Sequence, residues 1–291
     1  MVNYKAECLL DERNELGEGP VWDERLQELL WVDIEGCQLH RYRPSDGRKL
    51  QVQTEKKISA AVPAEDGTWL VALADGFYRL NLETGSIALI ARTEEETATN
   101  RLNDGKCDPA GRFWAGTISS WQNRNGHLYT LEDGHLTKQL SEIGCSNGLA
   151  WTADGTVMYY IDTFENYVYA FDYDIATGEI SNKRTVITFP EGEGSPDGMS
   201  IDSEGMLWVG HWGGWQIGRW NPLTGEKLAA IPIPVRNVTS CAFGGENLDE
   251  LYITTARQGN DEEQLSKQPL AGALFRVKLD VKGLPVQRAK I

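Results

Sequence analysis

Four short segments of the chain place oxygen-bearing side chains next to glycine. They are Gly17-Glu18-Gly19, Asn103-Asp104-Gly105, Asn147-Gly148 and Asp197-Gly198. One acid or amide beside glycine is typical of a turn. Together, however, Glu18, Asn147 and Asp197 offer only oxygen atoms, the donors that Ca²⁺, Mg²⁺ and Mn²⁺ prefer. Zn²⁺ also accepts carboxylates, but this set lacks the histidine and cysteine that zinc favours.

Three protein ligands would leave part of a cation's coordination sphere open to a substrate and to water. A cation held in this way polarises a carbonyl group and lowers the pKa of a bound water molecule. If the four segments meet in the folded protein, we therefore expect hydrolytic chemistry with one divalent metal ion. Ca²⁺ is the first choice, and Zn²⁺, Mn²⁺ and Mg²⁺ are the alternatives.

Two other patterns give weaker evidence for a catalytic or metal site. Residues 144–148 read GCSNG and match the Gly-x-Ser-x-Gly nucleophile elbow. That elbow requires a helix after the serine, whereas Leu149-Ala150-Trp151 and then a turn follow here. The histidines are too few and too scattered for a local metal motif, and we interpret His211 as structural. We therefore disfavour a serine hydrolase and a histidine-based metal site.

The elements that must gather the four segments form an internal repeat. Short apolar strands with a central aromatic residue recur at intervals of 38 to 48 residues. The aromatic residues are Trp31, Trp69, Trp114, Tyr160, Trp208 and Tyr252. Repeats of this length indicate a solenoid, a propeller or an array.

Glycine-terminated turns stand before and after the aromatic strand of most units, as in Glu65-Asp66-Gly67 and Glu83-Thr84-Gly85. Glycine supplies the positive φ that tight hairpins need. The remaining strands alternate with period two, as in residues 167–173, and no long segment has a helical period. Each unit thus reads as four strands.

Six such units predict an all-β fold, a six-bladed β-propeller with four antiparallel strands per blade, in one domain over residues 1–291. The first strand of every blade would then start at one mouth of the channel, where the four segments would converge. Most tryptophans would fill the blades, leaving Trp121, and Trp212 or Trp215, for a pocket. Residues 4–10 are expected to close the ring as an outer strand, with residues 286–290 as the competitor.

The amino-acid composition limits the classes of partner that the protein is expected to bind. The 291 residues include 28 basic and 43 acidic residues, a net charge of −15, which repels nucleic acid and anionic membranes. No apolar run is long enough to span a membrane, and no secretory signal is recognised at the N-terminus. Five scattered cysteines without a Cys-x-x-Cys pair favour reduced thiols. We expect a cytoplasmic protein without an obligatory protein partner.

Six segments in order along the chain make it resemble the senescence marker protein (regucalcin)/gluconolactonase family of sugar lactone hydrolases. They read GEGPVW at 17–22, RLNDGK at 101–106, DPAGR at 108–112, SNGL at 146–149, FDYD at 171–174 and PDGM at 196–199. The resemblance spans nearly the whole chain. It favours a bacterial, cytoplasmic lactonase.

The resemblance implies a six-bladed propeller with one catalytic divalent ion at Glu18, Asn147 and Asp197. It also implies that Asp197 accepts and donates protons and that Arg101 and Asn103 contact the sugar. One position departs from the family. Where members close to the animal protein carry an acidic sugar contact, this chain has a shorter loop containing Trp121, which we expect to stack on a sugar face.

The resulting hypothesis is metal-dependent hydrolysis of a sugar lactone, an aldonolactone such as glucono-1,5-lactone, to the acid. Two alternatives stay open. The first is a propeller that binds calcium or another ligand without turnover, since many propellers serve as platforms. The second is phosphotriester hydrolysis at the same metal site, because the cation could polarise a P=O group in the same way.

Overall fold

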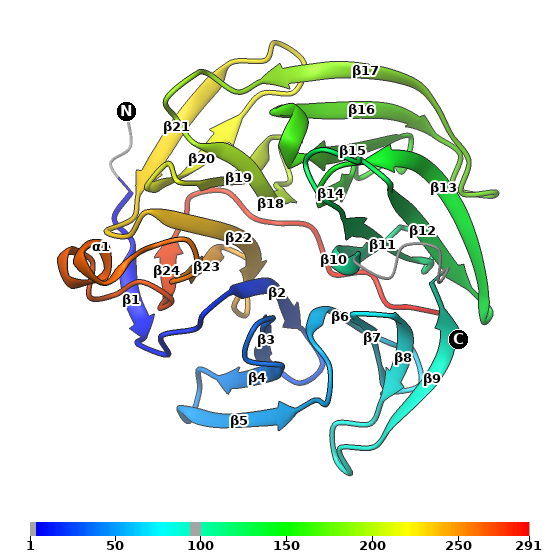
Figure 1. Ribbon diagram of the computed structural model, residues 1–291, viewed down its shortest axis with the longest axis horizontal. Helices are drawn as coiled ribbons and strands as arrows, with labels where there is room; N and C mark the ends of the chain where they lie inside the picture. Colours follow the sequence, from blue (N-terminus) through cyan, green and yellow to red (C-terminus); the bar gives the residue numbers. More distant parts are fainter. Residues whose placement is uncertain (1–3, 94–99, 291) are drawn as a thin grey trace.

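The computed structural model describes residues 4–93 and 100–290. These residues form six antiparallel sheets of four strands, arranged radially around a central channel (Figure 1). The predicted six-bladed β-propeller is confirmed. The first strands of neighbouring blades contact one another around the ring, so they line the channel.

The first three blades follow the chain without interruption. Blade 1 contains β2 (Gly17–Asp23), β3 (Glu28–Asp33), β4 (Gln38–Arg43) and β5 (Arg48–Gln53). Blade 2 contains β6 (Ile58–Pro63), β7 (Trp69–Leu73), β8 (Gly76–Leu80) and β9 (Ile87–Arg92). Blade 3 contains β10 (Arg101–Cys107), β11 (Phe113–Ile118), β12 (Gly126–Glu132) and β13 (His135–Ile143).

The other three blades include the junction between the two ends of the chain. Blade 4 contains β14 (Ser146–Trp151), β15 (Val157–Asp162), β16 (Tyr167–Tyr173) and β17 (Ile180–Thr188). Blade 5 contains β18 (Ser195–Ile201), β19 (Leu207–Trp212), β20 (Gln216–Trp220) and β21 (Lys227–Pro232). Blade 6 contains β22 (Asn237–Gly244), β23 (Glu250–Ala256), β24 (Leu274–Lys278) and β1 (Glu7–Leu10).

The repeated aromatic residues lie on the second strand of each blade and are buried. In two blades the indole also ties this strand to the turn that precedes it. Trp114 Nε1 donates to Asp108 Oδ2 over 2.8 Å, and Trp208 Nε1 donates to Asp202 Oδ2 over 2.9 Å. The same carboxylates accept backbone N–H groups of their turns. The sequence repeat is therefore a repeat of one packing and turn arrangement.

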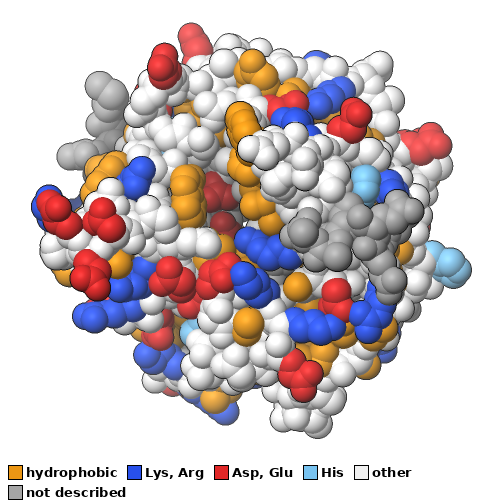
Figure 2. Space-filling view, viewed as in Figure 1, with side chains coloured by type: hydrophobic (Ala, Val, Ile, Leu, Met, Phe, Trp, Pro, Cys, Tyr) orange, Lys and Arg blue, Asp and Glu red, His pale blue; other side chains and the backbone are white. Residues whose placement is uncertain are grey.

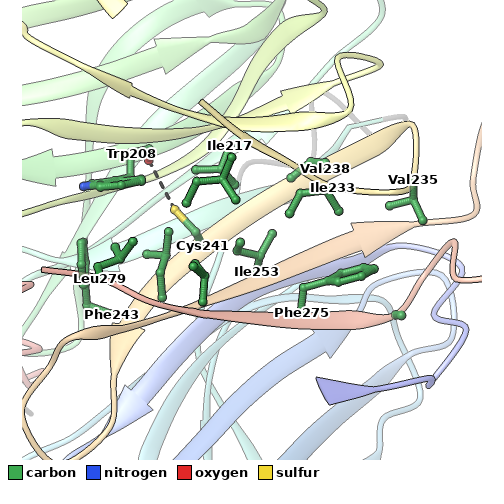
Figure 3. Close-up of a cluster of buried hydrophobic side chains, with 14 of the residues drawn as sticks. Trp208, Ile217, Ile233, Val235, Val238, Cys241, Phe243, Ile253, Phe275 and Leu279 are labelled. Carbon is green, nitrogen blue, oxygen red and sulfur yellow. Dashed lines mark hydrogen bonds between the residues drawn. The ribbon is translucent and has the colours of Figure 1, made fainter. Parts of the chain in front are cut away.

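The hydrophobic core lies between neighbouring blades. Figure 3 shows the contact between blades 5 and 6, where Trp208 and Ile217 face Cys241 and Phe275. Cys241 Sγ donates to the Trp208 carbonyl oxygen over 3.4 Å. Such clusters remove apolar area from water at roughly 25 cal/mol per Å², so each blade depends on its neighbours for stability.

The N-terminal strand closes the ring, as predicted. β1 pairs antiparallel with β24, with Glu7 opposite Arg276 and Cys8 opposite Phe275. Blade 6 is thus built from both ends of the chain. The competing segment, residues 286–290, does not act as the closing strand.

The C-terminal segment instead crosses the ring and touches several blades (Figure 1). Leu279 N–H donates to the Asp249 carbonyl of blade 6, and Ser203 N–H of blade 5 donates to the Lys282 carbonyl. Ala289 N–H donates to the Pro63 carbonyl of blade 2. This segment therefore forms a strap over the end of the channel.

Helices contribute little to the described chain. A 3₁₀ turn, η2 (Thr163–Glu165), links β15 to β16, and α1 (Glu262–Lys267) lies between β23 and β24. Asp261 and Gln264 form a capping box at the start of α1. Among residues 4–93 and 100–290, no helix combines the length and apolar character needed to cross a membrane.

Candidate active site

An open cavity of about 620 Å³ lies at the mouth where the inner strands begin. Figure 2 shows a hollow on this face, with acidic side chains at its bottom and hydrophobic side chains on its walls. All six predicted site residues line the cavity: Glu18, Arg101, Asn103, Trp121, Asn147 and Asp197. Its other lining residues are Leu16, Ile118, Cys145, Thr163, Phe164, Asn166, Ser195, Trp212 and Gln258. Trp212 thus reaches the cavity, whereas Trp215 is not among these residues.

Irregular strand pairing places the polar side chains at the mouth. The register between each inner strand and its neighbour shifts at the same level in all six blades. Glu18, Asn147 and Asp197 lie at or within these shifts, as does Asn103. A β-bulge bends the strand and redirects a side chain, and bulges are common next to active sites.

The glycines that follow these residues allow the inner strands to approach one another. A Cβ at Gly148 would lie 2.9 Å from the Asp197 carbonyl oxygen, and a Cβ at Gly198 would lie 2.1 Å from Ser240 Oγ. Only glycine fits such spacing without a shift of the neighbour. The Asx-Gly pairs noted in the sequence therefore mark close backbone contacts as well as bulges.

Glu18 and Asp197 are buried carboxylates without an ion-pair partner among the described residues. Burial raises the pKa of Glu18 to about 8, with repulsion from Asp104 adding to the shift. Burial and then repulsion from Glu18 raise the pKa of Asp197 well above its usual value. Arg101 opposes both shifts and does not cancel them. Without a bound cation, both carboxyls therefore keep their protons to a higher pH than an exposed acid does.

A chain of hydrogen bonds fixes the amides of the site. Arg101 Nη1 donates to Asn103 Oδ1 over 2.7 Å, and Asn103 Nδ2 donates to Asn147 Oδ1 over 3.2 Å. Asn147 Nδ2 donates to Thr163 Oγ1 over 2.8 Å, and this hydroxyl donates to the Pro196 carbonyl over 2.7 Å. The chain runs from blade 3 to blade 5 and ends next to Asp197. It orients the Asn147 amide so that its oxygen faces away from Thr163.

Sequence reasoning missed several groups. Asp104 is buried beside Glu18, and burial raises its pKa; its place in the Asn103-Asp104-Gly105 segment could have indicated it. Thr163 and Phe164 belong to η2, and Cys145 precedes β14. Nothing in the local sequence distinguishes these three from ordinary loop residues.

The family follows from the match of residues 16–257 to the group described as the SMP-30/gluconolactonase/LRE-like region. The chain belongs to this family. Regucalcin from Danio rerio is 43% identical over 290 residues, covering 98% of each chain. The similarity therefore extends over the whole propeller.

Two solved structures support the same assignment to the SMP-30/gluconolactonase family. A luciferin-regenerating enzyme superposes with a TM-score of 0.92 and 36% identity, covering 99% of this chain and 100% of that one. A calcium-binding protein, regucalcin, from Agrobacterium tumefaciens gives a TM-score of 0.95 at 28% identity, with complete coverage of both chains. The family thus includes proteins described by different activities.

The divalent cation that the family resemblance implies fits the residues present. Among residues 4–93 and 100–290, no three His, Cys, Asp or Glu side chains are grouped to hold a metal by themselves. The donor set expected from the sequence combines two carboxylates, Glu18 and Asp197, with the Asn147 amide oxygen, and all three side chains line the cavity. All three donors are oxygens, as hard cations require, and a cation there would offset the repulsion between the two carboxylates.

The serine of the Gly-x-Ser-x-Gly pattern, Ser146, and His211 do not line the cavity. Ser146 lies within β14 and is fully buried, and a Cβ at Gly116 would lie 2.0 Å from its Oγ. No helix follows it, so the nucleophile elbow is absent. His211 is buried, its Nδ1 bonds to the Glu193 carbonyl over 2.8 Å, and its ring stacks on Trp220. His211 has the contacts of a structural histidine.

Proposed function

We propose that the protein is a metal-dependent hydrolase that opens a sugar lactone, an aldonolactone such as glucono-1,5-lactone, to its acid. Membership of the SMP-30/gluconolactonase family supports this reaction class. The observation that carries the proposal is the pair of buried carboxylates, Glu18 and Asp197, at the bottom of an open cavity without a neutralising partner. A cation and a neutral, polar substrate would complete such a site.

Glu18, Asn147 and Asp197 would hold one divalent ion, with Ca²⁺ first and Zn²⁺, Mn²⁺ or Mg²⁺ as alternatives. When bound, this ion supplies polarisation of the lactone carbonyl and a lower pKa for nearby water. Hydrogen bonds already hold two of these three side chains in place. Asn147 is held by Asn103 and Thr163, and Glu18 Oε2 accepts the Gly19 N–H over 2.9 Å.

The protein's own side chains would carry the proton and orient the substrate. Asp197 accepts a proton from water while the water oxygen bonds to the carbonyl carbon. The bond between that carbon and the ring oxygen then breaks, and the ring oxygen takes the proton to become a hydroxyl group. Water and lactone thus give one hydroxy acid. Arg101, with Asn103 bonded to it, would orient the polar groups of the substrate.

Neutralising Asp197 tests its role. We expect Asp197→Asn to lower kcat for glucono-1,5-lactone by about 100-fold or more, the usual loss when a general base is removed. Asp154→Asn, at an exposed turn, is the matched control and should keep full activity. Thermal unfolding checks that both variants fold. An Asp197→Asn enzyme with normal turnover would remove this residue from the chemistry.

A panel of lactones and organophosphates, assayed with Ca²⁺, Zn²⁺, Mn²⁺ and Mg²⁺ and after EDTA treatment, tests the function as a whole. We expect lactone hydrolysis that EDTA abolishes and an added cation restores. Hydrolysis of the organophosphates alone would support the phosphotriesterase alternative. Activity that survives complete chelation would refute the metal-dependent mechanism.

A second candidate is calcium binding without turnover, because the similar Agrobacterium tumefaciens structure is described as a calcium-binding protein. Calorimetry with Ca²⁺ separates the two. Tight binding together with no hydrolysis of any lactone would favour this candidate.

We also propose a substrate class, a range of partners and a location in the cell. A sugar lactone is the expected partner, in carbohydrate metabolism, without nucleic acid, membrane or an obligatory protein partner. We also propose a cytoplasmic location. All five cysteines are free, as is usual in a reducing compartment.

A further inference from the structure

We propose that the cavity also hydrolyses lactones that carry an apolar alkyl substituent, which would lie against one apolar wall of the mouth. This inference rests on the proposed lactone hydrolysis and extends its substrate range. The wall consists of Ile118, Trp121 and Phe164, contributed by blades 3 and 4; we call it the aromatic wall. It is continuous with the cavity that holds Glu18 and Asp197.

The aromatic wall exposes apolar surface at the cavity, since Trp121 is exposed and Ile118 and Phe164 are only partly buried. Trp121 is 65% exposed, although seven of the other nine tryptophans are buried. Its ring meets the Phe164 ring edge to face, with centroids 5.0 Å apart. Contiguous exposed apolar surface beside a cavity marks a binding surface. A substituent placed there would remove this surface from water.

Hydrogen bonds hold the loop of Trp121 in place. At its start, Ser119 N–H donates to the Gly144 carbonyl over 2.8 Å, and Ser119 Oγ donates to the Ile143 carbonyl over 2.9 Å. At its end, Arg124 Nη2 lies 2.9 Å from Asp162 Oδ2 and 2.8 Å from Glu165 Oε1. The loop is therefore attached at its start to the end of β13 and the connection that follows it, and at its end to blade 4.

Asp162 joins the parts of the wall to the floor of the cavity. It is buried and accepts the backbone N–H groups of Gly144, Cys145 and Phe164. Its Oδ2 also accepts the hydrogen bond from Arg124 Nη2. One carboxylate thus positions the Trp121 loop, the Phe164 turn and the start of β14. A preformed wall costs little ordering free energy when a ligand binds.

The polar groups of the floor are largely committed within the protein. Asn103 Nδ2 donates to the Ser146 carbonyl over 2.8 Å and to Asn147 Oδ1, so both of its protons are used. The Asn147 amide and the Thr163 hydroxyl are engaged with each other. Asn103 and Thr163 therefore have little hydrogen-bonding capacity left for a substrate, while the aromatic wall offers apolar contact. A cavity of about 620 Å³ also falls within the range that holds drug-sized ligands.

Two lactones with the same ring test the inference. δ-Decalactone differs from δ-valerolactone by a pentyl chain next to the ring oxygen. Each buried methylene is worth roughly fourfold in affinity, so partial burial of five carbons should raise kcat/KM by about tenfold or more. We expect this preference in the wild-type protein with Ca²⁺, and we expect it to come from KM.

Variants then test whether the aromatic wall causes the preference for δ-decalactone. Trp121→Ala should remove most of the δ-decalactone advantage and affect δ-valerolactone less. Trp215→Ala is the matched control, because Trp215 is also exposed and does not line the cavity; it should preserve the ratio. Arg124→Gln should raise KM for δ-decalactone through a displaced loop, with kcat for δ-valerolactone maintained, and Arg124→Lys should restore part of the loss.

The matched lactams, which resist hydrolysis, give a measurement that needs no variant. The pentyl-substituted δ-lactam should inhibit glucono-1,5-lactone hydrolysis at about tenfold lower concentration than the unsubstituted one. Equal inhibition by both lactams, or equal kcat/KM for both lactones, would overturn the inference and leave glucono-1,5-lactone hydrolysis standing. Failure to hydrolyse any lactone would instead refute the proposed function itself.

Discussion

At the scale of single residues, the site is defined by charges that the protein buries at a cost. Burial raises the pKa values of Glu18, Asp104 and Asp197, and repulsion from Asp104 adds to the shifts of Glu18 and Asp197. Charged groups are normally buried only when they are paired. The protein keeps these groups at the end of inner strands that are otherwise well packed. This arrangement is what a cation-binding role would require and what a purely structural role would avoid.

The raised pKa of Glu18 predicts how the metal-free protein responds to pH. A carboxyl whose folded pKa, about 8, lies above its unfolded value of 4.5 contributes stability below pH 4.5 and loses it as the pH rises through 8. In EDTA, Tm should therefore fall between pH 5 and pH 8, by an amount on the order of 5 °C. Scanning calorimetry or thermal denaturation followed by circular dichroism measures this.

Glu18→Gln should flatten that pH dependence and weaken Ca²⁺ binding. Glu24→Gln, which removes an exposed carboxylate, should leave both unchanged. If Glu18→Gln keeps the full pH dependence, the buried charge at this position is not its source.

At the scale of elements, the irregular parts of the inner strands, more than the regular parts, determine where the polar side chains of the site point. Each inner strand pairs regularly along most of its length and shifts register near the mouth. The shift re-aims a polar side chain that would otherwise follow the alternation of the strand. β1 has a structural role instead, because its antiparallel pairing with β24 completes the last blade.

Removing residues 1–10 should destabilise the whole ring. β24 would lose its partner, and the contacts of Tyr4 with Trp208 and of Leu9 and Leu10 with the core would disappear. An exposed edge strand also promotes aggregation. We expect Tm to fall by roughly 10 °C, measured by differential scanning fluorimetry. Glu7→Ala, which breaks only an exposed ion pair with Arg276, should change stability by less than about 1 kcal/mol. A truncated protein that melts like the full chain would refute this closure.

At the scale of the whole molecule, the C-terminal strap connects blades that are distant in sequence. Arg288 Nη2 donates to Asp23 Oδ1 over 2.6 Å, and Asp23 is buried in blade 1. The strap also contacts blades 2, 5 and 6. Two contacts therefore hold the ring closed: β1 pairs with β24 at the perimeter, and the strap crosses the end of the channel.

Arg288→Ala should cost about 2 kcal/mol, because it removes a charged hydrogen bond from a buried carboxylate. The free energy of unfolding from urea denaturation measures the loss. Gln287→Ala, at an exposed neighbouring position, should have little effect. A stability equal to that of Gln287→Ala would show that the strap contributes nothing through this contact.

The fold could be predicted from the sequence because each blade repeats the same local arrangement. The Trp114 and Trp208 strands, the glycine turns and the period-two strands are local features, and six copies leave few architectures available. The candidate site was accessible for the same reason, since Glu18, Asn147 and Asp197 occupy equivalent places in the repeat. The Arg124–Asp162 contact had no local pattern, because it joins two loops of different blades.

By itself, the amino-acid sequence determined the propeller, the closing strand and the set of polar residues at the mouth, because hydrophobic periodicity and glycine turns act over short stretches of chain. Tertiary structure alone decided which groups share a low-dielectric cavity, and thus that Glu18 and Asp197 are buried together and that Trp121 stands over them beside Phe164. Desolvation and mutual repulsion depend on distances in space, which only the closed ring establishes.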